Sequence, residues 1–153
     1  MENPDRSWDG RPLESWLQTL EDPDGEARWR AIDALRHIAH PSQTIPLFVG
    51  SLNDPYWRAR ALAVHALYDI AVDEELVPLL SQAVIPLANA LSDSLPDISL
   101  EAARTLELIG PTAEAALAQL QDAVDRGDAE LRSAASDAIL TISGIVPVRR
   151  FPN

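Results

Sequence analysis

The residues with the strongest metal-binding chemistry are one carboxylate and two imidazoles spaced along a single segment. Asp33, His37 and His40 follow one another at i, i+4 and i+7, which places them on one face of a helix. Imidazole and carboxylate groups bind zinc, but a zinc site also needs groups that orient its ligands. The sequence offers no such supporting group, and a His near the end of a helix is favoured by the helix dipole alone. We therefore predict no metal site and no cofactor.

The other reactive residue types are equally sparse. His65 and Asp69 form an i, i+4 pair, which on a helix surface contributes only a few tenths of a kcal/mol. The acids at 73–75 begin an expected helix, where negative charge is stabilising. The chain has no Cys, no Gly-rich phosphate loop and no serine elbow. The sequence therefore predicts that the protein is not an enzyme.

These residues belong to a sequence motif that recurs along the chain, which we call the repeated phrase. Its first copy is Leu20-Glu21-Asp22-Pro23 followed by Ala27-Arg28, Ala31 and Ala34-Leu35, and its second is Leu52-Asn53-Asp54-Pro55 followed by Ala59-Arg60, Ala63 and Ala66-Leu67. Weaker copies begin near Leu91 and Leu131. Self-similarity with a period of about 30 to 40 residues indicates a stack of helical repeats.

Apolar residues at helical spacing flank each copy and predict four helix pairs. The first helices are expected near 12–20, 42–52, 74–91 and 112–125, and the second helices near 24–39, 55–71, 95–109 and 128–143. Asp22 and Asp54 stand directly before a Pro, so we expect each to cap a helix whose first residue is that Pro. Pro46 and Pro86 fall inside first helices and should bend them.

The phrase resembles HEAT repeats, in particular the short HEAT-like type that also occurs in phycobilin lyase proteins. Copies one and two match the family pattern of Asp, an apolar residue five positions on, Arg, Ala and Leu, and the resemblance covers about residues 12–144. It implies an all-α, right-handed α-solenoid of about four helix pairs, in which the Asp and Arg form ladders between turns. Ser99 replaces the Arg in copy three and Arg126 replaces the Asp in copy four. We therefore expect the ladder only in the N-terminal half.

These patterns divide the chain into three parts. We expect an N-terminal extension over 1–11, repeats over about 12–40, 41–72, 73–110 and 111–144, and an extended C-terminal tail over 145–153. The third repeat holds about seven extra residues within 71–82, which form either a plain link or a protrusion that shapes a partner surface. Trp8 and Trp16 are expected to cover the open end of the stack.

The second helices offer the best candidates for a binding surface, because in the HEAT family they line the concave face. The residues seven, eleven and fourteen positions after each Asp should point out of the core. Together with Trp57, they give the predicted binding residues Trp29, Asp33, Arg36, Trp57, His65, Tyr68, Arg104 and Glu107. Trp, Tyr and Arg are typical of binding hot spots. The alternative is that individual members pack against the neighbouring repeat.

The charge of the chain bears on its partner. The net charge is −12, and residues 71–144 hold 13 acidic residues against 3 Arg. This field repels phosphate backbones, so we expect no nucleic-acid partner, and it favours a protein partner with a basic segment. No apolar run reaches the roughly 20 residues of a membrane span, so we expect no membrane association.

The function that these features favour is a non-catalytic protein–protein interaction scaffold or adaptor. The lack of Cys and of a secretory signal favours a cytoplasmic location. The resemblance leaves open a bilin lyase-like or chromophore-handling subunit, and nucleic-acid binding of the kind some HEAT-like proteins show is a third hypothesis. The sequence leaves open the partner's identity and the oligomeric state.

Overall fold

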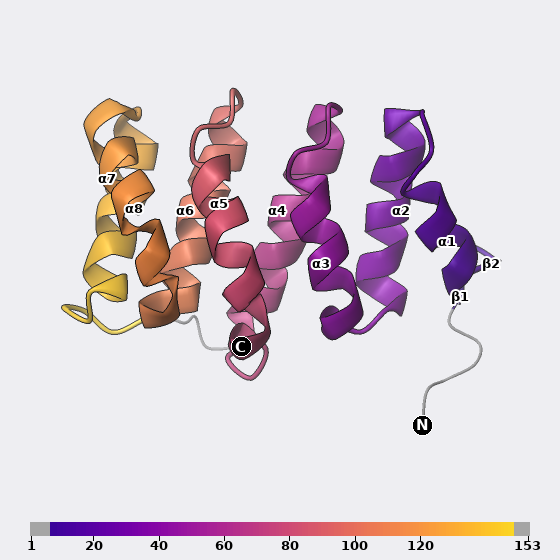
Figure 1. Cartoon of the computed structure of the whole chain (residues 1–153), viewed down its shortest axis with the longest axis horizontal. Coiled ribbons are helices and arrows are strands. Elements are labelled where there is room, and N and C mark those ends of the chain that lie inside the picture. The colour runs from indigo at the N-terminus through magenta and orange to yellow at the C-terminus, as the bar shows by residue number, and fades with distance from the viewer. Residues whose placement is uncertain (1–6, 149–153) are drawn as a thin grey trace.

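The computed structural model describes residues 7–148, which fold into two layers of helices (Figure 1). The elements are β1 (Ser7–Trp8), β2 (Arg11–Pro12), α1 (Leu13–Thr19), α2 (Gly25–Ile38), α3 (Pro41–Ser51), α4 (Trp57–Val72), the 3₁₀ helix η1 (Val77–Ala83), α5 (Val84–Ala90), α6 (Pro96–Ile109), the 3₁₀ helix η2 (Gly110–Ala116), α7 (Leu117–Arg126) and α8 (Ala129–Ile142). The expected all-α solenoid of four helix pairs is confirmed.

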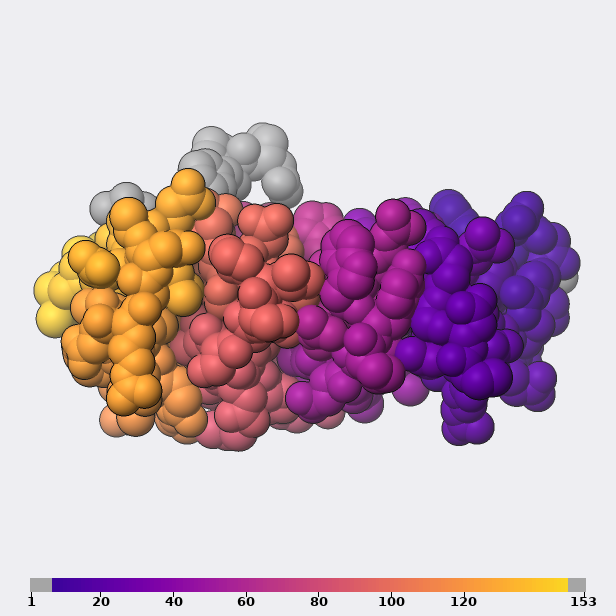
Figure 2. Space-filling model, turned by 90° about the horizontal axis from the view of Figure 1, so that it is seen from above, coloured from indigo at the N-terminus to yellow at the C-terminus, as the bar shows by residue number. Residues whose placement is uncertain are grey.

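The two layers are built from alternate helices. We refer to α1, α3, α5 and α7 as the A helices and to α2, α4, α6 and α8 as the B helices. Each B helix contacts the next one along the chain. Figure 2 shows the repeats following one another along the long axis in sequence order. The result is an elongated stack in which each repeat touches its neighbours.

Small residues on the B helices allow this close stacking. Ala31, Ala63 and Ala102 occupy equivalent positions on α2, α4 and α6, and all three are fully buried. Leu35 and Leu67 are also fully buried and fill the layer between the helices. The core therefore runs through the whole stack, because no single helix pair could bury its apolar face alone.

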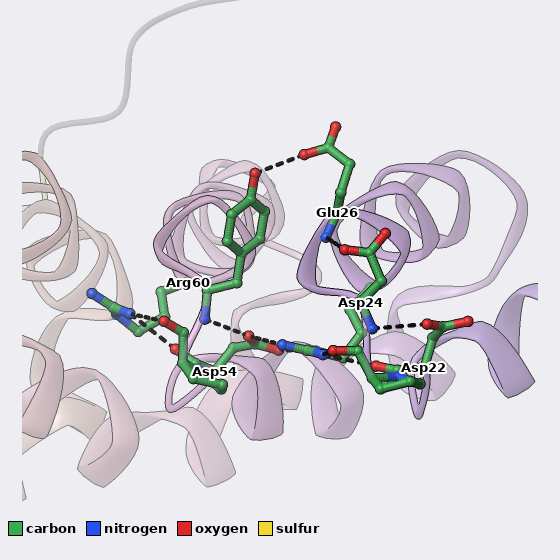
Figure 3. A network of polar contacts seen from close by, with 9 residues as sticks. Asp22, Asp24, Glu26, Asp54 and Arg60 are labelled. Carbon is green, nitrogen blue, oxygen red and sulfur yellow. Dashed lines mark hydrogen bonds and ion pairs between the residues drawn. The ribbon is translucent and has the colours of Figure 1, made fainter.

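The Asp residues of the repeated phrase do not cap helices as the sequence predicted. The side chain of Asp54 accepts the backbone N–H of Tyr56 at 2.8 Å, and α4 begins only at Trp57. In the first repeat, Asp22 accepts the backbone N–H of Asp24 at 2.8 Å, and it is Asp24 that caps α2 (Figure 3). The prediction was wrong because these carboxylates turn the chain before the helix and leave oxygens for the neighbouring repeat.

Arg side chains join the turns of successive repeats. Arg28 donates from Nε and Nη2 to the carboxylate of Asp54, both at 2.7 Å, and from Nη1 to the carbonyl oxygen of Asp22 at 2.7 Å. Arg60 bonds in the same way to Asp93, at 2.7 and 3.2 Å, and to the carbonyl oxygen of Asp54 at 2.9 Å. The four ionised side chains are between 8% and 16% exposed. Each Arg therefore ties its own turn to the next one (Figure 3).

The ladder reaches one repeat farther than expected. A rung takes its Arg from one repeat and its Asp from the next, so Asp93 completes the second rung although its own repeat lacks the Arg. At the interface between repeats three and four, Ser99 donates instead to the carbonyl oxygen of Pro96 at 3.0 Å. Arg126 is exposed there. This interface is held by apolar packing of α8 on α6 rather than by a rung.

The first helix of repeat three is broken, where the sequence predicted one helix over 74–91. The 3₁₀ helix η1 ends at Ala83 and α5 starts at Val84, so Pro86 lies in the first turn of a new helix. In a continuous helix, Pro86 would remove the hydrogen bond to the carbonyl of Gln82 and clash with it. The extra residues of this repeat form η1 and the turn before it.

After α8, the chain returns toward the first residue of η2. Val148 packs against the core and lies 2.9 Å from the position that a Cβ of Gly110 would occupy. Gly110 has a φ of +70°, so a side chain there would be strained as well as crowded. The remainder of the expected tail, 149–153, and the first part of the expected extension, 1–6, lie outside the described residues.

We predict that the Arg–Asp rungs make the free energy of unfolding depend on pH in the acidic range. Burial opposes ionisation of Asp93, but the hydrogen bonds from Arg60 and from the N–H of Leu95 outweigh it and hold the pKa of Asp93 below its ordinary value. The pKa of Asp54 is lowered for the same reasons, with Arg28 and Tyr56 as donors. A carboxyl with a lowered folded-state pKa stabilises the fold above its unfolded pKa, about 4, and loses this contribution as the pH falls through the folded value.

Asp93→Asn should therefore lower the free energy of unfolding at pH 7 by about 2 kcal/mol, because Arg60 loses its ionic partner. It should also reduce the loss of stability between about pH 5 and pH 2. Urea unfolding followed by circular dichroism over this pH range measures both effects, with the exposed Asp122→Asn as control. Parallel pH profiles for wild type and Asp93→Asn would contradict the prediction.

We also predict that a third rung can be installed. Ser99→Arg and Arg126→Asp place the rung residues at the third interface, where a hollow of about 180 Å³ beside Arg126 and Leu131 gives room. Ser99→Arg alone should destabilise, because it puts a charge without a partner at a buried position, whereas Arg126→Asp alone changes an exposed side chain and should have a small effect. A double-mutant cycle in urea should give a favourable coupling of about 1 kcal/mol. Additive effects of the two changes would show that no rung had formed.

Candidate functional site

An open hollow of about 420 Å³ lies on the B helices of the first three repeats. Its lining comes from α2, α4 and α6, so it spans two repeat interfaces. Two Trp side chains, two aliphatic side chains and three polar side chains form it. They are Trp29, Trp57, Arg58, Ala61, Leu62, His65 and Glu101.

The hollow arises from one small residue among large ones. Ala61 occupies in repeat two the position that Trp29 holds in repeat one and Leu100 in repeat three. Trp57, the first residue of α4, is 50% exposed and stands beside this depression. A methyl group flanked by indole rings leaves an apolar recess with aromatic walls.

The Trp57 side of the hollow is braced by contacts between repeats one and two. The guanidinium of Arg58 lies 5.4 Å from the centroid of the Trp57 ring. Arg58 Nη1 is 3.6 Å from Glu26 Oε2, which also accepts the hydroxyl of Tyr56 at 2.7 Å. This hydrogen bond to Glu26 raises the pKa of Tyr56. The aromatic wall is therefore held in place by residues of two helices.

A row of interacting polar side chains forms the other side of the hollow and continues beyond it. His65 Nδ1 lies 2.7 Å from Glu101 Oε1, and His65 Nε2 lies 3.7 Å from Asp69 Oδ2. Asp69 Oδ2 accepts Arg36 Nη2 at 2.9 Å. Arg36 is thus paired with Asp69 across the repeat interface, while Asp33 lies 3.7 Å from His37 on its own helix. These contacts link α2, α4 and α6 in one line.

The hollow brings together only part of the predicted binding stripe. Trp29, Trp57 and His65 line it, whereas Asp33 and Arg36 lie outside it. The other three predicted residues also lie elsewhere on the B helices: Tyr68 is half-buried against the core, Arg104 is exposed and Glu107 is half-buried.

Sequence reasoning missed three of the lining residues. Leu62 and Glu101 each stand eight positions after the Asp of their repeat, and Arg58 stands four positions after Asp54. The predicted stripe used positions seven, eleven and fourteen, which describe a single row along each helix. A row one residue wider, together with the next helical turn toward the N-terminus, would have included all three.

The two imidazoles near the end of α2 have structural partners. The ring of His37 stacks on Trp8 with centroids 4.3 Å apart and planes 9° from parallel. His40 Nδ1 accepts the backbone N–H of Ser42 at 3.2 Å and so caps α3. Trp16 is buried at the same end of the stack, as expected for a residue that covers it. Between residues 7 and 148, no three potential ligands are grouped to hold a metal ion.

The hollow offers apolar contact, aromatic faces and hydrogen-bonding groups at its edge. Apolar recesses with a few polar groups at their edge are suited to holding an apolar group in a fixed orientation. None of the helices within residues 7–148 has both the length and the apolar character that a membrane crossing requires.

Comparison with known families identifies the repeated unit. Residues 13–85 match the family model for HEAT repeats. This segment contains the first two copies of the phrase and the first rung of the ladder. A search of curated proteins gave no significant match.

Solved structures with a similar fold include designed and engineered proteins. An engineered protein superposes with a TM-score of 0.67 at 25% identity, over 86% of this chain and 62% of that one. A designed armadillo repeat protein in complex with the peptide (KR)4 superposes with a TM-score of 0.71 at 21% identity, over 85% of this chain and 64% of that one. A second designed armadillo repeat protein gives 0.65 at 23% identity, over 86% and 64%. The chain thus spans less than two thirds of the length of these proteins.

The two Trp residues of the hollow should differ in their contribution to stability. We predict that Trp57→Ala lowers the free energy of unfolding by less than about 1 kcal/mol, because half of its surface is already in water. Trp29 is half-buried against the core, so Trp29→Ala should cost about 2–3 kcal/mol. Urea unfolding of both variants measures the difference. Equal large losses would show that Trp57 is a packing residue.

Proposed function

Because the chain carries HEAT repeats over residues 13–85 and extends them into one helical stack, we propose that it is a non-catalytic scaffold that binds a protein partner on its B helices. The partner contributes a peptide segment that crosses α2, α4 and α6. Repeat stacks present long continuous surfaces, and such surfaces suit extended segments.

The observation that carries this proposal is the exposed aromatic hollow. A Trp that is 50% exposed beside an Ala floor leaves apolar surface in water, which is unfavourable unless a partner covers it. Trp residues dominate the energy of many interfaces, since they bury a large area in a few rotamers. Trp57 is therefore proposed as the main anchor and Trp29 as its neighbour.

Charge favours a partner segment that is basic outside the hollow. The chain has a net charge of −12, and this field raises the rate at which cationic segments meet it. Within the hollow, Arg58, His65 and Glu101 are already engaged by neighbouring side chains. The segment thus places an apolar side chain in the hollow and its basic residues on either side.

The fold comparison supports the same kind of partner. A designed armadillo repeat protein with a similar helical stack is solved in complex with the peptide (KR)4. At 21% identity this likeness concerns the fold, so the basic peptide is a suitable first probe for this chain rather than its assigned ligand.

The proposal is tested by selecting peptides from a random display library with the wild-type chain. We expect enriched peptides that carry a large apolar residue beside basic residues. Trp57→Ala should weaken their binding about tenfold or more, as measured by calorimetry. Raising the salt concentration from about 50 to 300 mM should weaken binding further, because steering by the net charge is screened.

Leu140→Ala is the matched control, since Leu140 is an exposed apolar residue on the distant B helix α8. It should change the affinity by less than about twofold. The peptide (KR)4 and its acidic counterpart (DE)4 test the charge requirement separately. A selection without enrichment, or enriched peptides that bind Trp57→Ala as tightly as wild type, would overturn the proposed function.

A further inference from the structure

The A helices in the middle of the stack carry no charge. None of the 11 residues of α3, the 7 of η1 and the 7 of α5 is Asp, Glu, Lys or Arg. The chain as a whole is 24% charged, so about six charged residues would be expected in segments of this total length. Each of the four B helices, in contrast, carries charges of both signs.

Charged residues are absent from the exposed positions of these helices as well as from their buried positions. The exposed residues of these elements are Ser42, Gln43, Pro46, Gly50, Pro78, Ser81, Gln82, Ile85 and Asn89, and we refer to them as the uncharged A face. They recur at helical spacing along each helix, and α3 lies against η1, which continues into α5. Figure 1 shows α3 and α5 side by side in the front layer.

Two members of this face lack any internal explanation. Ile85 is 48% exposed on α5. Gly50 is exposed in the last turn of α3, and a Cβ at this position would meet no atom of the described residues within 4 Å. Among residues 7–148 nothing requires a glycine there, whereas a second backbone that approaches closely would.

Electrostatics limits what can cover this face. Two copies of a chain with a net charge of −12 repel each other, and contact through most of the surface would bury acidic groups against acidic groups. Contact through the uncharged A face avoids this cost. Depletion of charge is also the compositional feature that marks the central part of protein interfaces.

The polar residues of the face are suited to pairing with themselves. All of them are Ser, Gln or Asn, whose hydroxyl and amide groups both donate and accept hydrogen bonds. A two-fold axis brings the same patch of each copy together, so every group meets a group of its own kind. Amides and hydroxyls satisfy this condition, and carboxylates do not.

We propose that the uncharged A face is the interface of a homodimer, in which two copies pack α3, η1 and α5 around a two-fold axis. The face is about two helices wide, which puts it at the small end of specific interfaces, so association should be weak, with a Kd of about 10–100 µM. The dimer leaves the B helices of both copies facing outward, available to partners.

Sedimentation equilibrium between about 1 and 500 µM tests the dimer. We expect wild type to pass from monomer to dimer over this range. Ile85→Glu should remain monomeric because it buries a carboxylate at the axis. Leu140→Glu, which adds the same charge at an exposed apolar position on α8, should dimerise as wild type does.

A second variant keeps the proposal testable if Ile85→Glu disturbs folding. Gly50→Gln adds no charge and projects into open space in the monomer, so it should preserve helicity by circular dichroism and weaken dimerisation about tenfold or more. Trp57→Ala should dimerise normally, which separates this interface from the proposed peptide site. A wild type that stays monomeric at every concentration, or a Gly50→Gln variant that dimerises as wild type does, would overturn the proposal.

Discussion

The Arg–Asp rung is the interaction on which the geometry of the stack depends. Arg28 and Arg60 each bond to a carbonyl of their own turn and to the carboxylate of the next, so one guanidinium fixes the distance and the angle between two repeats. The carboxylate in turn holds the chain as it enters the following helix. A largely buried ion pair of this kind is geometrically strict, since a small displacement leaves charges without partners.

Much of the fold could be predicted from the sequence because the same pattern of small, apolar and charged residues recurs in successive repeats. Ala31, Ala63 and Leu35 recur in the phrase at helical spacing, and all three are fully buried. The details that failed depend on what the neighbouring repeat supplies. Asp54 is of a residue type that commonly caps helices. In the structure, its carboxylate instead accepts hydrogen bonds from an Arg of the previous repeat and from a backbone N–H of its own turn.

The candidate site was less predictable for a related reason. Counting along each helix found Trp29 and His65, because these residues have the right type at a regular position, and Trp57 was added for its residue type at the start of the second helix. It did not find the hollow, which exists because Ala61 is smaller than its counterparts in the adjoining repeats. It also did not pair Arg36 with Asp69, since these residues lie on different helices and are 33 positions apart in sequence. Whether any of these residues binds a partner remains a prediction, tested by the variants above.

The third interface has a consequence for the shape of the molecule. Repeats one to three are joined by directional ionic bonds, whereas repeat four is joined to them by apolar contacts that have no preferred direction. Sliding or rotation costs least where contacts are non-directional. We therefore expect the N-terminal three repeats to behave as one rigid arm and the stack to change its curvature most easily at the junction before repeat four.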